Sequence, residues 1–424
     1  MINTWTLNSG AKLVIEDIPH LRSAAIGAYI NVGSRNEDGA MAGASHFIEH
    51  MLFKGTSTRT ARNIAESFES MGGQLNAYTA KEYTCVYART LDEDIHSAVD
   101  IIFDMLFNAS FAEKDFNTER EVVYEEIGMY EDSPDELIHD VFAQKFWQGN
   151  SMGSPILGTV DSLGGMSRDD LFGFYNRHYI PSNMVIAIAG NINPQQLYDE
   201  INGIMEKQKQ SPLEFVKTKP EHVTPFISTV SKEIEQVQIC LAVPGISYFD
   251  EDRYTQNVFN TILGGGISSR LFQSLREELG LAYSVFSSAT SYSDTGLLGI
   301  FIGTGPGKVD KFFEALYTQL EVLLKQGIFE DELNRTKKLM KSSVFLGLES
   351  VMNRMNRLGR GILMYDEIVT PEEVMEKIYA VDLEKVHTYI KRILQPGNFS
   401  MAAIGDGQHM PVVEQAFQKW WGNR

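Results

Sequence analysis

Two pairs of similar segments recur along this 424-residue chain at nearly the same separation. Pro181–Gly190 resembles Pro396–Gly405, which lies 215 residues further on. Asp115–Val123 resembles Glu332–Met340, which lies 217 residues further on. Two matches in the same order indicate a duplicated domain of about 210 residues. The chain is therefore restricted to architectures that contain two copies of one domain fold. The alternative is a chance similarity between generic amphipathic segments.

Each half carries strand-like runs followed by amphipathic helices. Ala24–Val32 and Val237–Val243 predict strands, and Met184–Ala189 predicts the strand that closes the first half. Apolar residues at helical spacing predict helices over Asp94–Phe107 and Lys308–Leu324. Strands and helices are interspersed without strict β-α-β alternation. We therefore expect an α+β fold of two tandem homologous domains, each a mostly antiparallel or mixed sheet packed with helices.

A polar stretch that contains Pro212 and Pro220 separates the two halves. It has no sustained periodicity, which is typical of a linker between domains. We expect one domain at 1–212, a linker at 213–224 and a homologous domain at 225–424.

The balance of charge excludes one class of protein. Lys and Arg number 37 and Asp and Glu number 56, which gives a formal net charge of −19. A nucleic-acid-binding protein normally carries a basic surface, so we expect no nucleic-acid partner.

The apolar runs are too short to cross a membrane, and the first residues lack the pattern of a secretory signal. Cys85 and Cys240 lack metal-type spacing, so we expect buried thiols in a cytoplasmic protein.

The strongest chemical signal is the segment His46-Phe-Ile-Glu49-His50. On a helix the two histidines are four residues apart, so both imidazoles leave the same face and can bind one Zn²⁺. Glu49 lies next to one ligand, where its carboxylate can take a proton from a water as a general base. This H-x-x-E-H order occurs in zinc peptidases. The alternative is two ordinary histidines on a helix.

A catalytic zinc site needs a third protein ligand. Glu119 and Glu126 are seven residues apart on a predicted helix, so they share a face with Val122 and Val123 between them. A carboxylate on an apolar face is costly unless it is paired or bound to a metal. This argument leaves both glutamates open as the third ligand.

The segment His46–Thr56 resembles the zinc helix of the pitrilysin-type inverzincins, the family of insulysin, pitrilysin and the mitochondrial processing peptidases. The resemblance covers nearly the whole chain and is greatest to the two-domain bacterial processing peptidases. It implies one Zn²⁺ per chain, held by His46, His50 and Glu126, which follows His50 by 76 residues as the family's third ligand does. It also implies that Glu119 is a second acidic residue beside the metal ligands.

The second half has no equivalent of the zinc motif, so we expect it to be free of metal. It carries Arg276 and Tyr283, seven residues apart. The resemblance implies that Arg276 holds a substrate carbonyl and that Tyr283 stabilises the oxyanion formed on attack. The alternative is a helical ion pair for the arginine and a strand core for the tyrosine. The resemblance further implies a homodimer in which this pair serves the zinc site of the partner chain.

The segment Gly72–Thr79 resembles the edge strand on which the family aligns its substrate. An extended peptide can add to such an edge through main-chain hydrogen bonds, and Asn76 and Ala77 are the candidate contacts. The same sequence also fits a hairpin with its turn at Gly72–Gly73.

These observations predict a zinc endopeptidase that hydrolyses unfolded peptides or protein segments in an enclosed chamber. The acidic charge favours peptides with basic residues as substrates. The alternative is a non-catalytic peptide-binding or scaffold subunit of a processing-peptidase-like complex.

Overall fold

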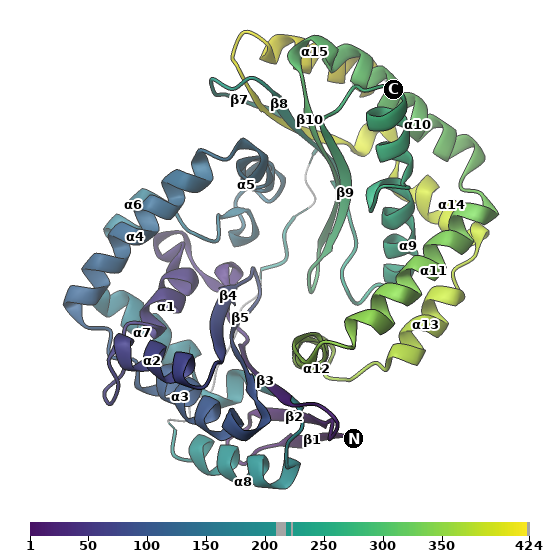
Figure 1. The fold of residues 1–424 in the computed structure, drawn as a ribbon. Helices are drawn as coiled ribbons and strands as arrows, with labels where there is room; N and C mark the ends of the chain where they lie inside the picture. The colour runs from purple at the N-terminus through teal and green to yellow at the C-terminus, as the bar shows by residue number, and fades with distance from the viewer. Residues whose placement is uncertain (209–217, 222–223, 422–424) are drawn as a thin grey trace. The chain divides into compact units, whose positions relative to one another are not determined.

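The computed structural model describes residues 1–208, 218–221 and 224–421, and it divides into two compact units (Figure 1). The predicted linker at 213–224 lies mostly outside the described residues. Unit 1 consists of Met1–Met129, Ser154–Thr218 and Phe345–Val369, and unit 2 of Tyr130–Gly153, Lys219–Val344 and Thr370–Arg424. Each unit therefore contains one segment from the other half of the sequence.

Unit 1 is built on a six-stranded sheet with the order β1-β2-β6-β3-β5-β4. The strands β2 and β6 are parallel and all other neighbours are antiparallel. The strand β4 lies at one edge and pairs only with β5. The strands are β1 (Ile2–Thr6), β2 (Lys12–Asp17), β3 (Ser23–Ile30), β4 (Gln74–Thr79), β5 (Thr84–Leu91) and β6 (Met184–Gly190).

Unit 2 is built on a five-stranded sheet with the order β7-β11-β8-β10-β9. Its strands are β7 (Ile227–Ser231), β8 (Val237–Pro244), β9 (Ser284–Ser291), β10 (Gly296–Thr304) and β11 (Ser400–Gly405). Taken in chain order, they repeat the arrangement of β2 to β6, including the single parallel pair, here β7 with β11. The shared topology confirms the α+β prediction and the internal repeat.

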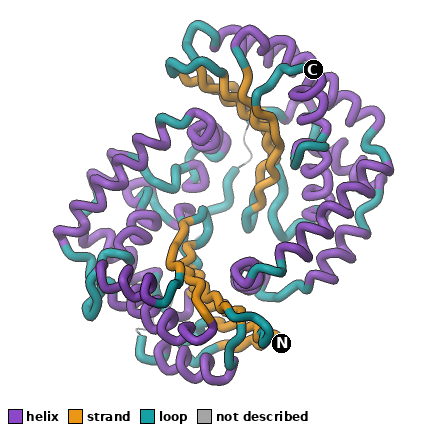
Figure 2. The backbone as a smooth tube through the Cα atoms, in the orientation of Figure 1, coloured by secondary structure: helices purple, strands orange, loops and turns teal. Residues whose placement is uncertain are grey.

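Helices pack on both sheets (Figure 2). The predicted helices at 94–107 and 308–324 are confirmed as α3 and α10. No helix in the described ranges has the length and apolar character needed to cross a membrane. The helices are α1 (Ala44–Leu52), α2 (Ala61–Ser70), α3 (Ile95–Asn108), α4 (Glu113–Glu131), α5 (Pro134–Phe146), α6 (Val160–Gly165), α7 (Arg168–His178), α8 (Pro194–Met205), α9 (Arg253–Gly264), α10 (Val309–Gln326), α11 (Glu330–Gly347), α12 (Val351–Tyr365), α13 (Pro371–Tyr379), α14 (Leu383–Ile393) and α15 (Met410–Trp421).

The two halves of the sequence exchange a helix. The helix α5 comes from the first half and buries Phe142 against Ala242 and Phe301 of the second sheet. The helix α12 comes from the second half and covers one face of the first sheet. Its buried residues Met355 and Leu358 join a cluster with residues of β2, β3, β5 and β6. A helix from the other half of the chain thus covers part of the apolar surface of each sheet.

The contact between α12 and β3 depends on a glycine. A Cβ atom at Gly359 would lie 2.1 Å from the ring of Tyr29, so only a residue without a side chain lets the helix approach this closely. The hydroxyl of Tyr29 donates a hydrogen bond to Asn356 Oδ1 at 2.6 Å, which fixes the ring beneath the helix.

We predict that Gly359→Ala lowers the free energy of unfolding by about 1–3 kcal/mol, because the added methyl overpacks this contact. Gly203 is the matched control, since it also lies in a helix, α8, and a Cβ there meets nothing within 4 Å. Gly203→Ala should raise stability by up to about 1 kcal/mol through helix propensity. Equal stability of Gly359→Ala and the wild type in urea denaturation would show that α12 does not press on Tyr29.

Candidate metal centre

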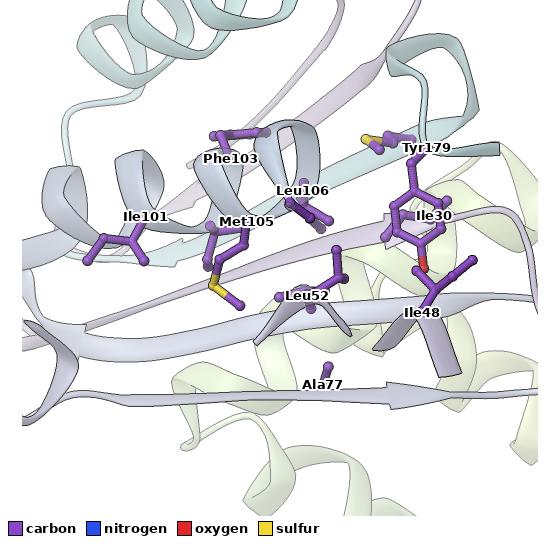
Figure 3. Packing of buried hydrophobic residues seen from close by; sticks show 14 of the residues in the cluster. Ile30, Ile48, Leu52, Ala77, Ile101, Phe103, Met105, Leu106 and Tyr179 are labelled. Atoms are coloured by element: carbon purple, nitrogen blue, oxygen red, sulfur yellow. The ribbon is translucent and has the colours of Figure 1, made fainter. Parts of the chain in front are cut away.

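The helix α1 presents its two histidines because its opposite face is completely buried. Figure 3 shows Leu52 close to Leu106 of α3 and to Ala77 of β4, and Ile48 close to Tyr179. This apolar side fixes the rotation of the helix about its axis, which leaves His46 and His50 on the remaining side. The buried residues of this face are Phe47, Ile48, Met51 and Leu52.

The beginning of α1 is held by a carboxylate from outside the helix. Glu37 is buried and accepts hydrogen bonds from the backbone N–H groups of Gly43 and Ser45, at 2.8 and 2.6 Å. Gly43 itself provides no side-chain cap, and its φ of +94° favours glycine. An acceptor at this end satisfies two N–H groups that have no partner within the helix. Glu37 therefore fixes where the histidine-bearing helix starts.

Three side chains converge on one point. Glu126 Oε2, from α4, lies 3.6 Å from His46 Nε2 and 3.4 Å from His50 Nε2. One donor atom from each residue lies within 4.8 Å of the other two, an arrangement that can hold a metal ion. Tetrahedral zinc with bonds of about 2.0–2.2 Å places its donors about 3.3–3.5 Å apart. Two histidines and one glutamate also form a common ligand set of catalytic zinc sites, so the residues fit zinc.

A second carboxylate lies behind His50. Glu119 Oε2 is 3.1 Å from His50 Nδ1, and Glu119 Oε1 is 2.6 Å from Lys54 Nζ. An imidazole that donates its Nδ1–H to a carboxylate keeps the lone pair of Nε2 for a metal. Sequence reasoning missed Lys54, although it lies only four residues after His50. The ammonium group of Lys54 compensates the charge of Glu119, whose side chain is only 5% exposed.

The environment sets the proton affinity of two groups at this centre. Burial and, to a smaller extent, the neighbouring His50 together lower the pKa of His46 to about 3. His46 is therefore neutral at physiological pH and can donate a lone pair without losing a proton first. Burial raises the pKa of Glu49, whereas a hydrogen bond from Thr79 and the nearby His50 lower it and Glu126 raises it. A raised pKa suits a carboxylate that accepts a proton near neutral pH.

The strand β4 carries Asn76 and Ala77 at the edge of the sheet. The hairpin alternative was wrong about its turn, because Gly72–Gly73 joins α2 to β4. The turn between β4 and β5 lies instead at the contact from the Ala80 N–H to the Tyr83 carbonyl, at 2.8 Å. The side-chain oxygen of Asn76 accepts the N–H of Ala77 at 2.8 Å, so it is already used within the strand.

Arg276 and Tyr283 belong to unit 2, whereas the three candidate ligands belong to unit 1. Arg276 lies in a π-helical turn, η6 (Phe272–Glu278), with its guanidinium 4.7 Å from the ring centre of Phe272. Its ion contact with Glu277 is long, at 3.9 Å. Tyr283 precedes β9 and is 75% exposed, so the alternative of a strand-core tyrosine was wrong.

Both halves of the chain match known protein families. Residues 12–160 match the insulinase family, also called peptidase family M16, and residues 165–340 match the inactive domain of the same family. The chain belongs to peptidase family M16. This peptidase is 41% identical to a zinc protease of Bacillus subtilis, YmxG, over 97% of its own length and 100% of that relative. It is 37% identical to a zinc protease of Streptomyces coelicolor, with coverage of 93% and 87%.

Solved structures show the same fold. A protease from Helicobacter pylori superposes with a TM-score of 0.90 at 20% identity, over 96% of this chain and 99% of that one. An M16 inactive-domain protein from Pseudomonas fluorescens superposes with a TM-score of 0.88 at 20% identity, over 96% and 98%. These structures confirm the predicted fold, and the sequence relatives confirm the family resemblance and the prediction of a zinc protease.

We predict that Glu119→Gln weakens zinc binding about 10- to 100-fold, because a neutral amide is a weaker acceptor for the Nδ1–H of His50. Glu125→Gln is the matched control on the same helix, since Glu125 is exposed. Competition for zinc with a chelating dye measures both affinities. Equal affinities for the two variants would remove Glu119 from the support of the metal site.

Proposed function

We propose that His46, His50 and Glu126 hold one zinc ion per chain and that Glu49 is the general base of peptide-bond hydrolysis. The observation that carries this proposal is the approach of Glu126 to both imidazole Nε2 atoms, at 3.6 and 3.4 Å. A zinc ion in such a site supplies Lewis-acid activation of water and of the substrate carbonyl.

Glu49 is suited to proton transfer by its place on α1. It precedes His50 directly, so its carboxylate lies beside the ligands without being one of them. Glu49 takes the proton of the attacking water and then gives it to the nitrogen of the leaving amine. Tyr283 donates its hydroxyl hydrogen to the oxyanion of the substrate, and Arg276 holds a substrate carbonyl. The high exposure of Tyr283 supports this role, because its hydroxyl is accessible.

The substrate is an unfolded peptide segment that adds to β4 within an enclosed chamber. The free edge of β4 supports this proposal, since main-chain hydrogen bonds at an edge bind extended peptides with little demand on sequence. Asn76 and Ala77 are the proposed contacts.

The net charge of −19 supports a preference for basic peptides. Salt should slow cleavage of a basic peptide more than cleavage of an acidic one.

The active form of the enzyme is a homodimer, and it is located in the cytoplasm. In this dimer Arg276 and Tyr283 serve the zinc site of the partner chain. The presence of both parts in one sequence supports this assembly, because two identical chains then supply two complete sites. The two cysteines, Cys85 and Cys240, are buried and unpaired, which fits a reducing compartment.

We predict that Glu49→Gln retains zinc and lowers kcat at least about a hundredfold, because it removes the proton acceptor and none of the three ligands. Zinc content by elemental analysis and cleavage of an unfolded peptide provide the measurements. Glu125→Gln, on the exposed side of α4, should keep both properties. Full activity of Glu49→Gln would refute Glu49 as the base. Lack of zinc-dependent cleavage by the wild type would favour a peptide-binding subunit instead.

Mixing two inactive variants tests the shared site. Tyr283→Phe should lower kcat, as Glu49→Gln does, because it removes the oxyanion donor. After unfolding and refolding together at equal amounts, half of the dimers contain one chain of each kind. Each such dimer has one complete site if Tyr283 acts on the partner, so activity should return to about a quarter of the wild type. A mixture no more active than its components would show that no site is shared between chains.

A further inference from the structure

Thr79 connects the edge strand β4 to the helix that carries the proposed base. Its hydroxyl donates a hydrogen bond to Glu49 Oε2 at 2.6 Å. Alternate side chains of a strand point to opposite faces of a sheet. Thr79 therefore points to the same face as Ala77, which is buried against the side chains beneath α1 (Figure 3).

The hydrogen bond makes the two carboxylate oxygens of Glu49 different. Oε2 accepts the hydroxyl of Thr79, and no second protein hydrogen bond to Glu49 is found in the described ranges. Oε1 is left as the oxygen that can face a water. A glutamate has three rotatable side-chain bonds, so a single short hydrogen bond removes much of its freedom to turn the wrong oxygen toward the reaction.

We propose that Thr79 is a positioning residue, which holds Glu49 Oε2 so that Oε1 takes the proton of the attacking water. The inference rests on the proposed function of Glu49. It adds that one strand aligns both partners of the reaction: the backbone of β4 at Asn76 and Ala77 receives the peptide, and the side chain of Thr79 orients the base. A shift of β4 along its own axis would therefore misplace substrate and base together.

Two variants separate the hydroxyl from the shape of the side chain. Thr79→Val keeps the branched shape and removes the donor, and we expect kcat to fall about tenfold with KM unchanged. Thr79→Ser keeps the hydroxyl and should restore kcat to within about threefold of the wild type. Thr84→Val is the matched control, because Thr84 is the cross-strand neighbour of Thr79 on β5 and donates to the Val32 carbonyl instead. It should leave kcat within about threefold of the wild type.

Measurements in the Glu49→Gln background show whether Thr79 acts through Glu49. In the Glu49→Gln background, Thr79→Val should cause no further loss of residual kcat, since the group that it orients is absent. The affinity of this background for a fluorescent unfolded peptide, measured by anisotropy, and its zinc content should also stay unchanged. A role of Thr79 in folding, metal binding or peptide binding would change one of these two quantities and overturn the proposal.

The same set of variants distinguishes a failure of the positioning role of Thr79 from a failure of the proposed function. If Glu49→Gln is inactive while Thr79→Val is as active as the wild type, the positioning role fails and the proposed function stands. If Glu49→Gln is fully active, the proposed function fails, and the role of Thr79 fails with it. A similar loss of kcat in Thr84→Val and Thr79→Val would also overturn the proposal, because it would indicate a general disturbance of the hairpin.

Discussion

One buried face of a nine-residue helix fixes the candidate metal centre. Burying its four large apolar side chains contributes roughly 6–12 kcal/mol before the entropy of folding is counted. Rotation of α1 about its axis would expose this face, so His46 and His50 stay directed toward Glu126. The hydrogen bonds that Glu37 accepts from the N–H groups of Gly43 and Ser45 also fix the residue at which α1 begins. The packing of α1 thus holds the candidate ligands close to Glu126 without help from a metal.

Much of the fold and of the centre could be predicted from local patterns. The repeat and the apolar periodicity predicted α3, α10, β3, β6 and β8, because these segments are long and regular. The spacing of His46 and His50 placed both on one helix face by geometry alone. Helical spacing could not choose between Glu119 and Glu126, since both lie on one side of α4. The distinction arises from residues distant in sequence: His50 Nδ1 and Lys54 engage Glu119, which leaves Glu126 for both Nε2 atoms.

Contacts between distant segments account for what the sequence did not reveal. Val122 was expected beside the glutamates on an inward face of the helix, but the residue is 40% exposed. Helical spacing shows which side of a helix is buried, but it does not show where the buried stripe ends. The hydrogen bond between Thr79 and Glu49 joins residues thirty positions apart and has no local pattern. The apolar stripe of an amphipathic helix also does not say which sheet it covers, so the exchange of α5 and α12 could not be predicted.

That exchange makes the duplicated halves mutually dependent. A protein that ended at the linker would keep the six strands of the first sheet but lack α12, so Val14, Tyr29 and Val185 would face water. It would also carry α5 with no second sheet to cover. Such a fragment would be prone to self-association through its bare apolar surface. Gene fission at the repeat boundary would therefore yield soluble products only if each fragment acquired a substitute for the missing helix.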